Sequence, residues 1–177
     1  VADGMTALEA ARDVAVERGY EPLVLSSRIR GEAREAATTH VAIAEEVRAT
    51  GSPVSPPAVL LSGGETTVTI RGDGTGGPNQ EFATSAALEL ARDAEDSRDG
   101  DCGEITVAAV DTDGIDGVTD VAGALVDTKT VEQPEIAREA LAENDVFPYL
   151  AARHALVRTG STGTNLNDLR IVIVERA

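Results

Sequence analysis

The residues best suited to ligand chemistry lie between Leu60 and Phe82. Small and hydroxyl-bearing residues follow an apolar run there, together with one acid: Gly63, Gly64, Glu65 and Thr66. A second group consists only of glycines: Gly72, Gly74, Gly76 and Gly77. Glycine leaves its backbone amide uncovered, and successive uncovered amides bind anions. The stretch therefore predicts a site for a negatively charged group.

A helix is expected to begin directly after these glycines. Pro78 suits the first turn of a helix, because its missing N–H is not needed there. Asn79, Gln80 and Glu81 would then lie at the helix N-terminus, where the amides and the helix dipole favour an anion. Between the two glycine groups, residues 67–71 (TVTIR) alternate polar and apolar side chains. That alternation predicts a strand with one buried face.

Four aspartates follow the apolar run ITVAAV within ten residues: Asp111, Asp113, Asp116 and Asp120. The run reads as a buried strand, and ligands of open α/β sheets collect beyond the carboxyl ends of strands. Carboxylates at that position suit Mg²⁺, which prefers one or two of them together with water and substrate phosphates. The alternative is an acidic turn that caps the next element. The spacing alone favours neither interpretation.

A third loop of similar composition spans residues 158–168 (RTGSTGTNLND). All three loops are rich in Gly, Thr, Asn and Asp, and each is expected at the end of a strand. Hydroxyls and amides in such loops surround oxyanions, so the sequence indicates a small anionic or phosphorylated ligand and leaves the chemistry open. Gly72, Gly74 and Gly77 also match the pattern G-x-G-x-x-G, but no acid follows a second strand at the distance that a dinucleotide site requires.

The pattern of apolar residues predicts an α/β protein with a mixed, mostly parallel sheet flanked by helices in α/β/α layers. Helices are expected at residues 5–18, 31–49, 78–93, 134–143 and 146–152. Strands are expected at residues 22–26, 58–62, 105–110, 155–158 and 168–174, and residues 122–127 read as a strand or a short helix. The proline-rich segment 51–57 can be neither helix nor central strand, so a boundary is expected between segments 1–56 and 57–177. His40 has no partner at ligand spacing and is interpreted as a structural or surface histidine.

Composition narrows the classes of partner. The chain has 177 residues with 31 acids against 15 bases, which gives a net charge of −16. A field of that sign repels nucleic acid and anionic membranes. With Lys129 as its one lysine, the chain is typical of a protein from a halophile. It has no apolar run of membrane-spanning length, and its single cysteine, Cys102, suits a reducing cytoplasm. The first residue is Val1, inside a helical pattern, which is expected of a fragment.

Four phrases together resemble the C-terminal domain of the glycerate 2-kinase family, a domain known as MOFRL. They are LLSGGETTVTIRGDGTGGPNQE, DTDGIDGVTDVAGALVD, END and TGSTGTNLNDL, and they span residues 57–174 in order. An older name for the family is hydroxypyruvate reductase. The resemblance implies an enzyme that uses ATP and Mg²⁺ to phosphorylate D-glycerate at its 2-hydroxyl, in a cleft between this domain and a larger N-terminal domain.

The resemblance also implies roles for the residues of its motifs. Catalysis would fall to Asp113, Asn79 and Glu81, and Asp113 and Asp116 would hold the metal. Substrate and phosphate would be bound by the remaining motif residues and the nearby glycines: Gly63, Gly64, Glu65, Thr66, Gly76, Gly77, Gln80, Thr162, Gly163, Thr164 and Asn165. Many family members carry arginine where this chain has Pro78, so either another arginine replaces it or the amides suffice.

The partners implied are D-glycerate and the N-terminal domain of the same protein, without which the fragment is expected to be inactive. A homodimer is left open. Two rival functions remain at this stage. One is a hydroxypyruvate reductase that transfers a hydride from NAD(P)H, and the other is a non-catalytic module that binds a small anion.

Overall fold

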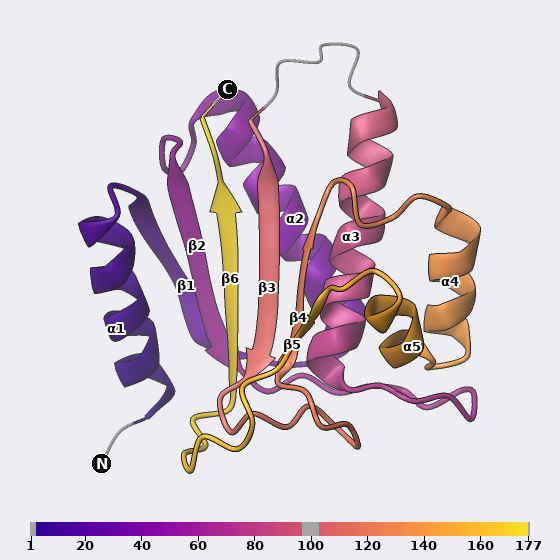
Figure 1. Ribbon diagram of the computed structural model, residues 1–177. Helices are drawn as coiled ribbons and strands as arrows, with labels where there is room; N and C mark the ends of the chain where they lie inside the picture. The colour runs from indigo at the N-terminus through magenta and orange to yellow at the C-terminus, as the bar shows by residue number, and fades with distance from the viewer. Residues whose placement is uncertain (1–2, 97–102, 177) are drawn as a thin grey trace.

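The computed structural model describes residues 3–96 and 103–176, without the side chains of residues 93–96. Its helices alternate with strands along most of the chain (Figure 1). They are α1 (Gly4–Glu17), α2 (Ala33–Thr50), α3 (Pro78–Asp96), α4 (Pro134–Ala142) and α5 (Val146–Ala151). The helices expected from the sequence are therefore confirmed within a few residues. Cys102 and most of the acidic stretch around it lie outside the described residues.

One six-stranded sheet organises the molecule. Its strands are β1 (Glu21–Ile29), β2 (Ala58–Gly64), β3 (Ile105–Asp111), β4 (Gly123–Asp127), β5 (Leu156–Val157) and β6 (Asp168–Val174), in the order β1-β2-β6-β3-β4-β5. Segment 122–127, which the sequence left between two readings, is thus a strand over most of its length. The mixed, layered α/β class predicted from the sequence is confirmed.

The expectation of a mostly parallel sheet is wrong. Only β1 and β2 pair in parallel, and the other four pairings are antiparallel. The reason is the position of β6, which enters between β2 and β3 and runs against both. Without β6 those two strands would be parallel neighbours, as the alternation of helix and strand suggests.

Helices cover the two faces of the sheet unequally. On one face α1 packs over β1, β2 and β6 through Leu8, Val59 and Leu61. On the other face α2 and α3 lie across the sheet, and the larger core there includes Leu60, Phe82 and further residues of α4 and α5 (Figure 1). This explains why β2 is buried along its whole length, whereas β3 and β6 alternate between buried and half-buried residues.

The proline-rich segment 51–57 does not separate two cores. Parallel pairing of β1 with β2 joins the elements before it to those after it, and α2 and α3 share one apolar cluster. His40 in α2 is buried, with Nδ1 2.7 Å from the Ala36 carbonyl oxygen and Nε2 2.7 Å from Ser62 Oγ. Burial lowers the pKa of His40, and the structural role expected for it is confirmed.

The strand expected at residues 67–71 is absent. Thr67 forms a single bridge to Glu32, and Ile70 is 74% exposed. The alternating side chains lack a neighbouring strand with which to pair, so the segment runs as an extended loop toward α3.

Candidate active-site edge

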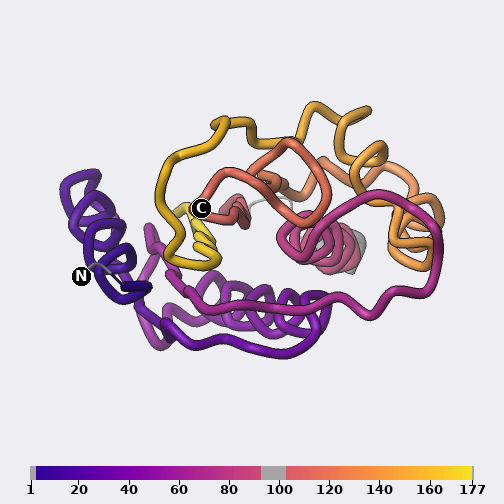
Figure 2. Tube along the Cα trace, turned by 90° about the horizontal axis from the view of Figure 1, so that it is seen from below, coloured from indigo at the N-terminus to yellow at the C-terminus, as the bar shows by residue number. Residues whose placement is uncertain are grey.

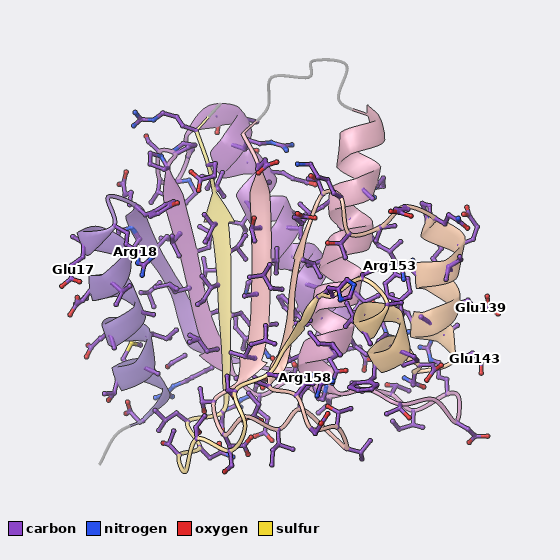
Figure 3. The ribbon with its side chains drawn as sticks, in the orientation of Figure 1. Glu17, Arg18, Glu139, Glu143, Arg153 and Arg158 are labelled. Carbon is purple, nitrogen blue, oxygen red and sulfur yellow. The ribbon has the colours of Figure 1, made fainter. Side chains whose placement is uncertain are left out.

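The loops that carry the motifs meet at one end of the sheet. β2 and β3 end there and β6 begins there, so segments 65–77, 112–122 and 158–167 all lie below the sheet in Figure 1. Figure 2, seen from below, shows segments 112–122 and 158–167 side by side, while segment 65–77 passes round to α4 and α5. Arg158 lies at this edge (Figure 3), where its guanidinium group contacts both Asp120 carboxylate oxygens at 2.9 Å.

Asp116 occupies the N-terminus of α3. One carboxylate oxygen accepts hydrogen bonds from Asn79 N at 3.0 Å and Asn79 Nδ2 at 3.2 Å. The other accepts from Gln80 N and Gln80 Nε2, both at 2.9 Å. Asp116 is 1% exposed, and burial raises the pKa of this carboxyl group although the amide donors oppose that shift. The anion predicted at this helix N-terminus is therefore supplied by the chain itself.

This geometry changes the roles expected for several residues. Because each Asp116 oxygen already accepts two amide hydrogen bonds, which use both of its lone pairs, Asp116 does not fit as a metal ligand here. Asn79 and Gln80 are buried partners of a cap. Gly77 and Gly76 allow close packing: a Cβ atom on Gly77 would overlap the Asp116 carboxyl group, and one on Gly76 would lie 2.5 Å from a Val146 methyl group. Contact of these residues with substrate or phosphate stays a prediction.

The glycine loop is held by the residues of the END motif. Asn144 Oδ1 accepts from Arg71 N at 2.6 Å and Gly72 N at 3.0 Å, and Gly74 N donates to the Glu143 carbonyl oxygen. Asp145 Oδ1 accepts from Thr75 N at 2.9 Å. The expectation that the amides of residues 72 and 74 are open to an external anion is therefore wrong, since they are bonded within the chain.

Glu81 belongs to the same internal framework. Its carboxylate accepts from Arg34 Nε at 2.9 Å and from Asn144 Nδ2 at 2.7 Å, and the side chain is almost fully buried. Arg34 also donates to the Leu141 carbonyl oxygen. The predicted catalytic roles of Glu81 and Asn79 have no support in this geometry, because neither side chain reaches the surface.

A buried pair that sequence reasoning missed joins the remaining motifs. Asp168 accepts from Asn79 Nδ2 at 2.7 Å and from Thr66 N at 3.2 Å. Arg170, also fully buried, donates to Asp168 and, at 2.8 Å, to Thr66 Oγ1. Burial lowers the pKa of Arg170, and the Asp168 charge opposes that shift. The sequence signal was present, because Asp168 and Arg170 are two charged residues at alternate positions of an otherwise apolar strand, and buried charges need partners.

Of the two carboxylates of the TDGIDG motif, Asp113 is the one that remains at the surface. It is half-buried; Oδ1 accepts from Ile115 N at 2.8 Å, and Oδ2 lies 3.1 Å from the donor Asn165 Nδ2. Thr162 N donates to the Asp113 carbonyl oxygen at 3.0 Å. Thr162 and Asn165 therefore contact Asp113, and Gly163 and Thr164 lie between them in the same exposed loop. Their joint role in one site stays a prediction. Asp113 also forms the turn that was the alternative interpretation.

Asp111 lies beside Asp113 at the same edge. Partial burial, together with the charges of Asp113 and Asp168, raises the pKa of Asp111 to about 6. The neighbouring carboxylates of Asp111 and Asp113, together with buried Asp168, concentrate negative charge that a bound cation would offset. The donor set fits Mg²⁺ at Asp113, with Asp111 next to it, since this ion takes few protein ligands. Among the described residues no group of three or more acidic, His or Cys side chains is arranged around one point.

The end of β2 completes the edge. Gly63 and Gly64 are buried within the strand, paired with Leu169 and Asp168 of β6. Glu65 is exposed, with its amide bonded to the Ile29 carbonyl oxygen, whereas the Thr66 side chain is turned inward to Arg170. Of the four residues from Gly63 to Thr66, Glu65 is thus the one whose side chain can meet a ligand from outside.

These features define an α/β domain whose motif loops converge at one end of the sheet. The profile of the MOFRL family matches residues 58–168, and this chain belongs to that family. In the part of the chain that the structure describes, no helix is long and apolar enough to cross a bilayer.

Named relatives share almost the whole chain. A D-glycerate 2-kinase of Thermotoga maritima is 39% identical over 94% of this chain, and a glycerate 2-kinase of Pyrococcus horikoshii is 37% identical over 98%. A protein of Agrobacterium vitis that bears the name of a hydroxypyruvate reductase is 42% identical over 98%. This chain spans 38–39% of the length of these relatives.

Solved structures agree with the fold. A crystal structure of a glycerate kinase from Thermotoga maritima is similar with a TM-score of 0.88 and 35% identity, over 97% of this chain and 40% of that one. A structure of a Pyrococcus horikoshii protein has the same TM-score with 36% identity, over 100% of this chain and 39% of that one.

Proposed function

We propose that this chain is the C-terminal part of a glycerate 2-kinase, which transfers a phosphoryl group from ATP to the 2-hydroxyl of D-glycerate. The observation that carries the proposal is the placement of Asp113. It is half-buried at the carboxyl edge of the sheet and joined to the exposed loop that includes Thr162 and Asn165. The relatives named as glycerate 2-kinases support the same reading.

Phosphoryl transfer depends on positioning and charge neutralisation more than on covalent chemistry. Asp113 would hold Mg²⁺, which when bound offsets the negative charge of the phosphates. The exposed amides and hydroxyls of residues 162–165 would orient reactant oxygens. The internal bonds of Asp116 and Asp168 hold the loops in place, so that the surface groups keep their geometry during the reaction. The α3 amides, being occupied by Asp116, are not proposed to bind ATP.

The remaining part of the site is proposed to come from an N-terminal domain of the same protein. The relatives are more than twice as long as this chain, which supports a site completed by other residues. Residues 1–177 alone are therefore expected to lack turnover, because a transferring phosphate held from one side is not positioned.

The test is a pair of assays on the full-length gene product. ATP-dependent phosphorylation of D-glycerate with Mg²⁺ is the expected activity. Because the Agrobacterium vitis relative bears the name of a hydroxypyruvate reductase, the oxidation of NAD(P)H in the presence of hydroxypyruvate is the second activity to measure. Oxidation of NAD(P)H without phosphorylation of glycerate would show that the protein is a reductase and not a kinase. Binding of small anions with neither activity would indicate a non-catalytic module.

A further inference from the structure

A pocket lined by two arginines lies next to the candidate active-site edge. It has a volume of about 480 Å³, and its walls include Arg28, Arg30, Gly64, Glu65 and Asn167. Ligand pockets for small molecules begin at roughly 300 Å³. The pocket is therefore large enough for the end of a small ligand, and its residues come from the ends of β1 and β2 and from the loop before β6.

The charge in this pocket is unusual for the chain. Arg28 and Arg30 are exposed, and within the described ranges 3–96 and 103–176 neither guanidinium group takes part in an ion pair or hydrogen bond. Glu65 is the one acid among the pocket residues, so their net charge is positive (two bases less one acid). In a protein with 31 acids and 15 bases, a local excess of unpaired positive charge indicates a counter-charge that arrives from outside.

The backbone around the pocket is fixed. Glu65 N donates to the Ile29 carbonyl oxygen at 3.0 Å, and Thr67 N donates to the Gly31 carbonyl oxygen at 2.8 Å. Gly64 packs directly against the backbone of Ile29, at a φ of 123° that favours glycine. The Cα positions of the two arginines are thus set by the pairing of β1 with the end of β2, and a ligand would have only their side chains to order.

Asn167 links the wall of this pocket to the Asp113 loop. The Asn167 carbonyl oxygen accepts from Thr112 N at 3.1 Å and from Thr112 Oγ1 at 2.8 Å, one residue before Asp113. A ligand that extends from Asp113 across Asn167 would place its far end at the arginines.

We propose that Arg28 and Arg30 bind an oxyanion of one reactant, either the carboxylate of the hydroxy acid or a phosphate of the nucleotide. A guanidinium group matches both, because its fork of N–H donors bonds two oxygens at once. This inference rests on the proposed kinase function for its choice of ligands. In this proposal the two arginines bind the reactant before the reaction, and the chemical step takes place at Asp113.

The kinetic test uses the full-length protein with Arg28→Gln, Arg30→Gln and the double substitution. We expect the KM of one reactant to rise at least tenfold in the double variant while kcat stays within about threefold of wild type. This is the result of losing an interaction that is equally strong in the bound substrate and in the transition state. A raised KM for D-glycerate identifies the carboxylate, and a raised KM for ATP identifies the phosphate. Arg18→Gln is the matched control: Arg18 is exposed and lies beside α1, away from the lower edge (Figure 3). Wild-type KM values for both reactants would overturn the proposal and leave the kinase intact.

A second measurement does not depend on turnover. Melting temperature is recorded with inorganic phosphate and with D-glycerate, against chloride at equal ionic strength, since a ligand of the native state raises it. We expect at least one of these probes to raise the melting temperature of the wild type and of Arg18→Gln, and to raise that of the double variant less. Equal shifts in all three proteins, or no shift with either probe, would overturn the arginine pocket whether or not the protein proves to be a kinase.

Discussion

At the scale of single residues, the two aspartates of the TDGIDG motif have opposite surroundings. Asp113 is half-buried, and its bonds are to one backbone amide and one exposed amide side chain. Asp116 is buried, and its bonds are to four donors of α3. Replacing each aspartate by asparagine removes the charge and keeps the shape. We therefore expect this change to lower activity at Asp113 and stability at Asp116.

We expect Asp113→Asn to lower kcat of the full-length protein by roughly 10², the effect of removing one preorganised electrostatic group. The melting temperature should stay within a few degrees, because asparagine can still accept the bond from Ile115 N. The measurements are glycerate phosphorylation and thermal unfolding. A kcat within about threefold of wild type would leave Asp113 as a turn residue only.

Asp116→Asn should lower the stability of the fold. The asparagine NH₂ group would face N–H donors of α3 that now donate to a carboxylate oxygen, and those hydrogen bonds would be lost. Hydrogen bonds to a charged group contribute about 1.5–3 kcal/mol each, so we expect a loss of at least about 2 kcal/mol in the free energy of unfolding. Urea denaturation of residues 1–177 measures it. An unchanged midpoint would show that the Asp116 cap does not stabilise the fold.

Asp111 should make stability depend on pH. Its pKa is raised to about 6 in the fold, against an ordinary value of 3.8, so the folded chain binds the proton more tightly than the unfolded chain. The contribution of Asp111 is then fully present below pH 3.8 and is lost as the pH rises through about 6. Asp111→Asn imitates the protonated state at every pH.

The melting temperature of Asp111→Asn relative to wild type should accordingly rise between about pH 4 and pH 6 and level off above that range. Other groups titrate in both proteins and cancel in the difference. A difference that does not change with pH would mean that neither the partial burial of Asp111 nor the charges of Asp113 and Asp168 raise its pKa in the fold.

At the scale of elements, the glycine loop and α3 depend on close packing. A Cβ atom at Gly77 would overlap the Asp116 carboxyl group, so Gly77→Ala should destabilise the chain by about 1–3 kcal/mol, the usual cost of overpacking. Gly4→Ala in α1 is the control, because the nearest atom to its added Cβ is 3.5 Å away and alanine favours helix. Urea denaturation compares the two. Equal stability of both variants would show that the loop around Gly77 shifts to accept the added methyl group without lowering the free energy of unfolding.

The elements also show how far the sequence could be read. The spacing of apolar residues located the helices and most strands, because the buried face of a helix or strand is apolar at a regular interval along its own sequence. It could not show that β6 enters between β2 and β3, since nothing within a strand identifies its neighbours. The alternation at residues 67–71 misled for the same reason: a strand needs a partner, and only Thr67 has one.

The sequence predicted loops that lie together at one edge of the sheet, and the structure places them there. It did not predict how the roles divide, because Asp116, Glu81 and Asn79 bond to residues of their own chain. Asp116 meets Gln80 across 36 positions of sequence, and no local pattern reports such a pairing. Composition alone therefore did not distinguish a carboxylate that binds a ligand from one that closes the framework around it.

At the scale of the whole molecule, charge is the dominant feature. With a net charge of −16 on 177 residues, repulsion between carboxylates disfavours the compact state, and salt screens that repulsion. We propose a halophilic source for this reason, and we expect the melting temperature to rise by several degrees between about 0.1 M and 2 M KCl. Sucrose at matched viscosity serves as the uncharged control. A melting temperature that is flat or falls with KCl would contradict the proposal.

The place of β6 in the sheet has a consequence for how the chain reaches its structure. β6 is synthesised after the other five strands of this sheet, yet it lies between β2 and β3, which precede it by more than 50 residues. Until β6 is made, β1 with β2 and β3 with β4 and β5 are two separate groups of strands, each with an open edge that can join another chain. Contacts so distant in sequence also slow folding. We therefore expect nascent chains that stop before Asp168 to be the species most prone to aggregate and most dependent on chaperones.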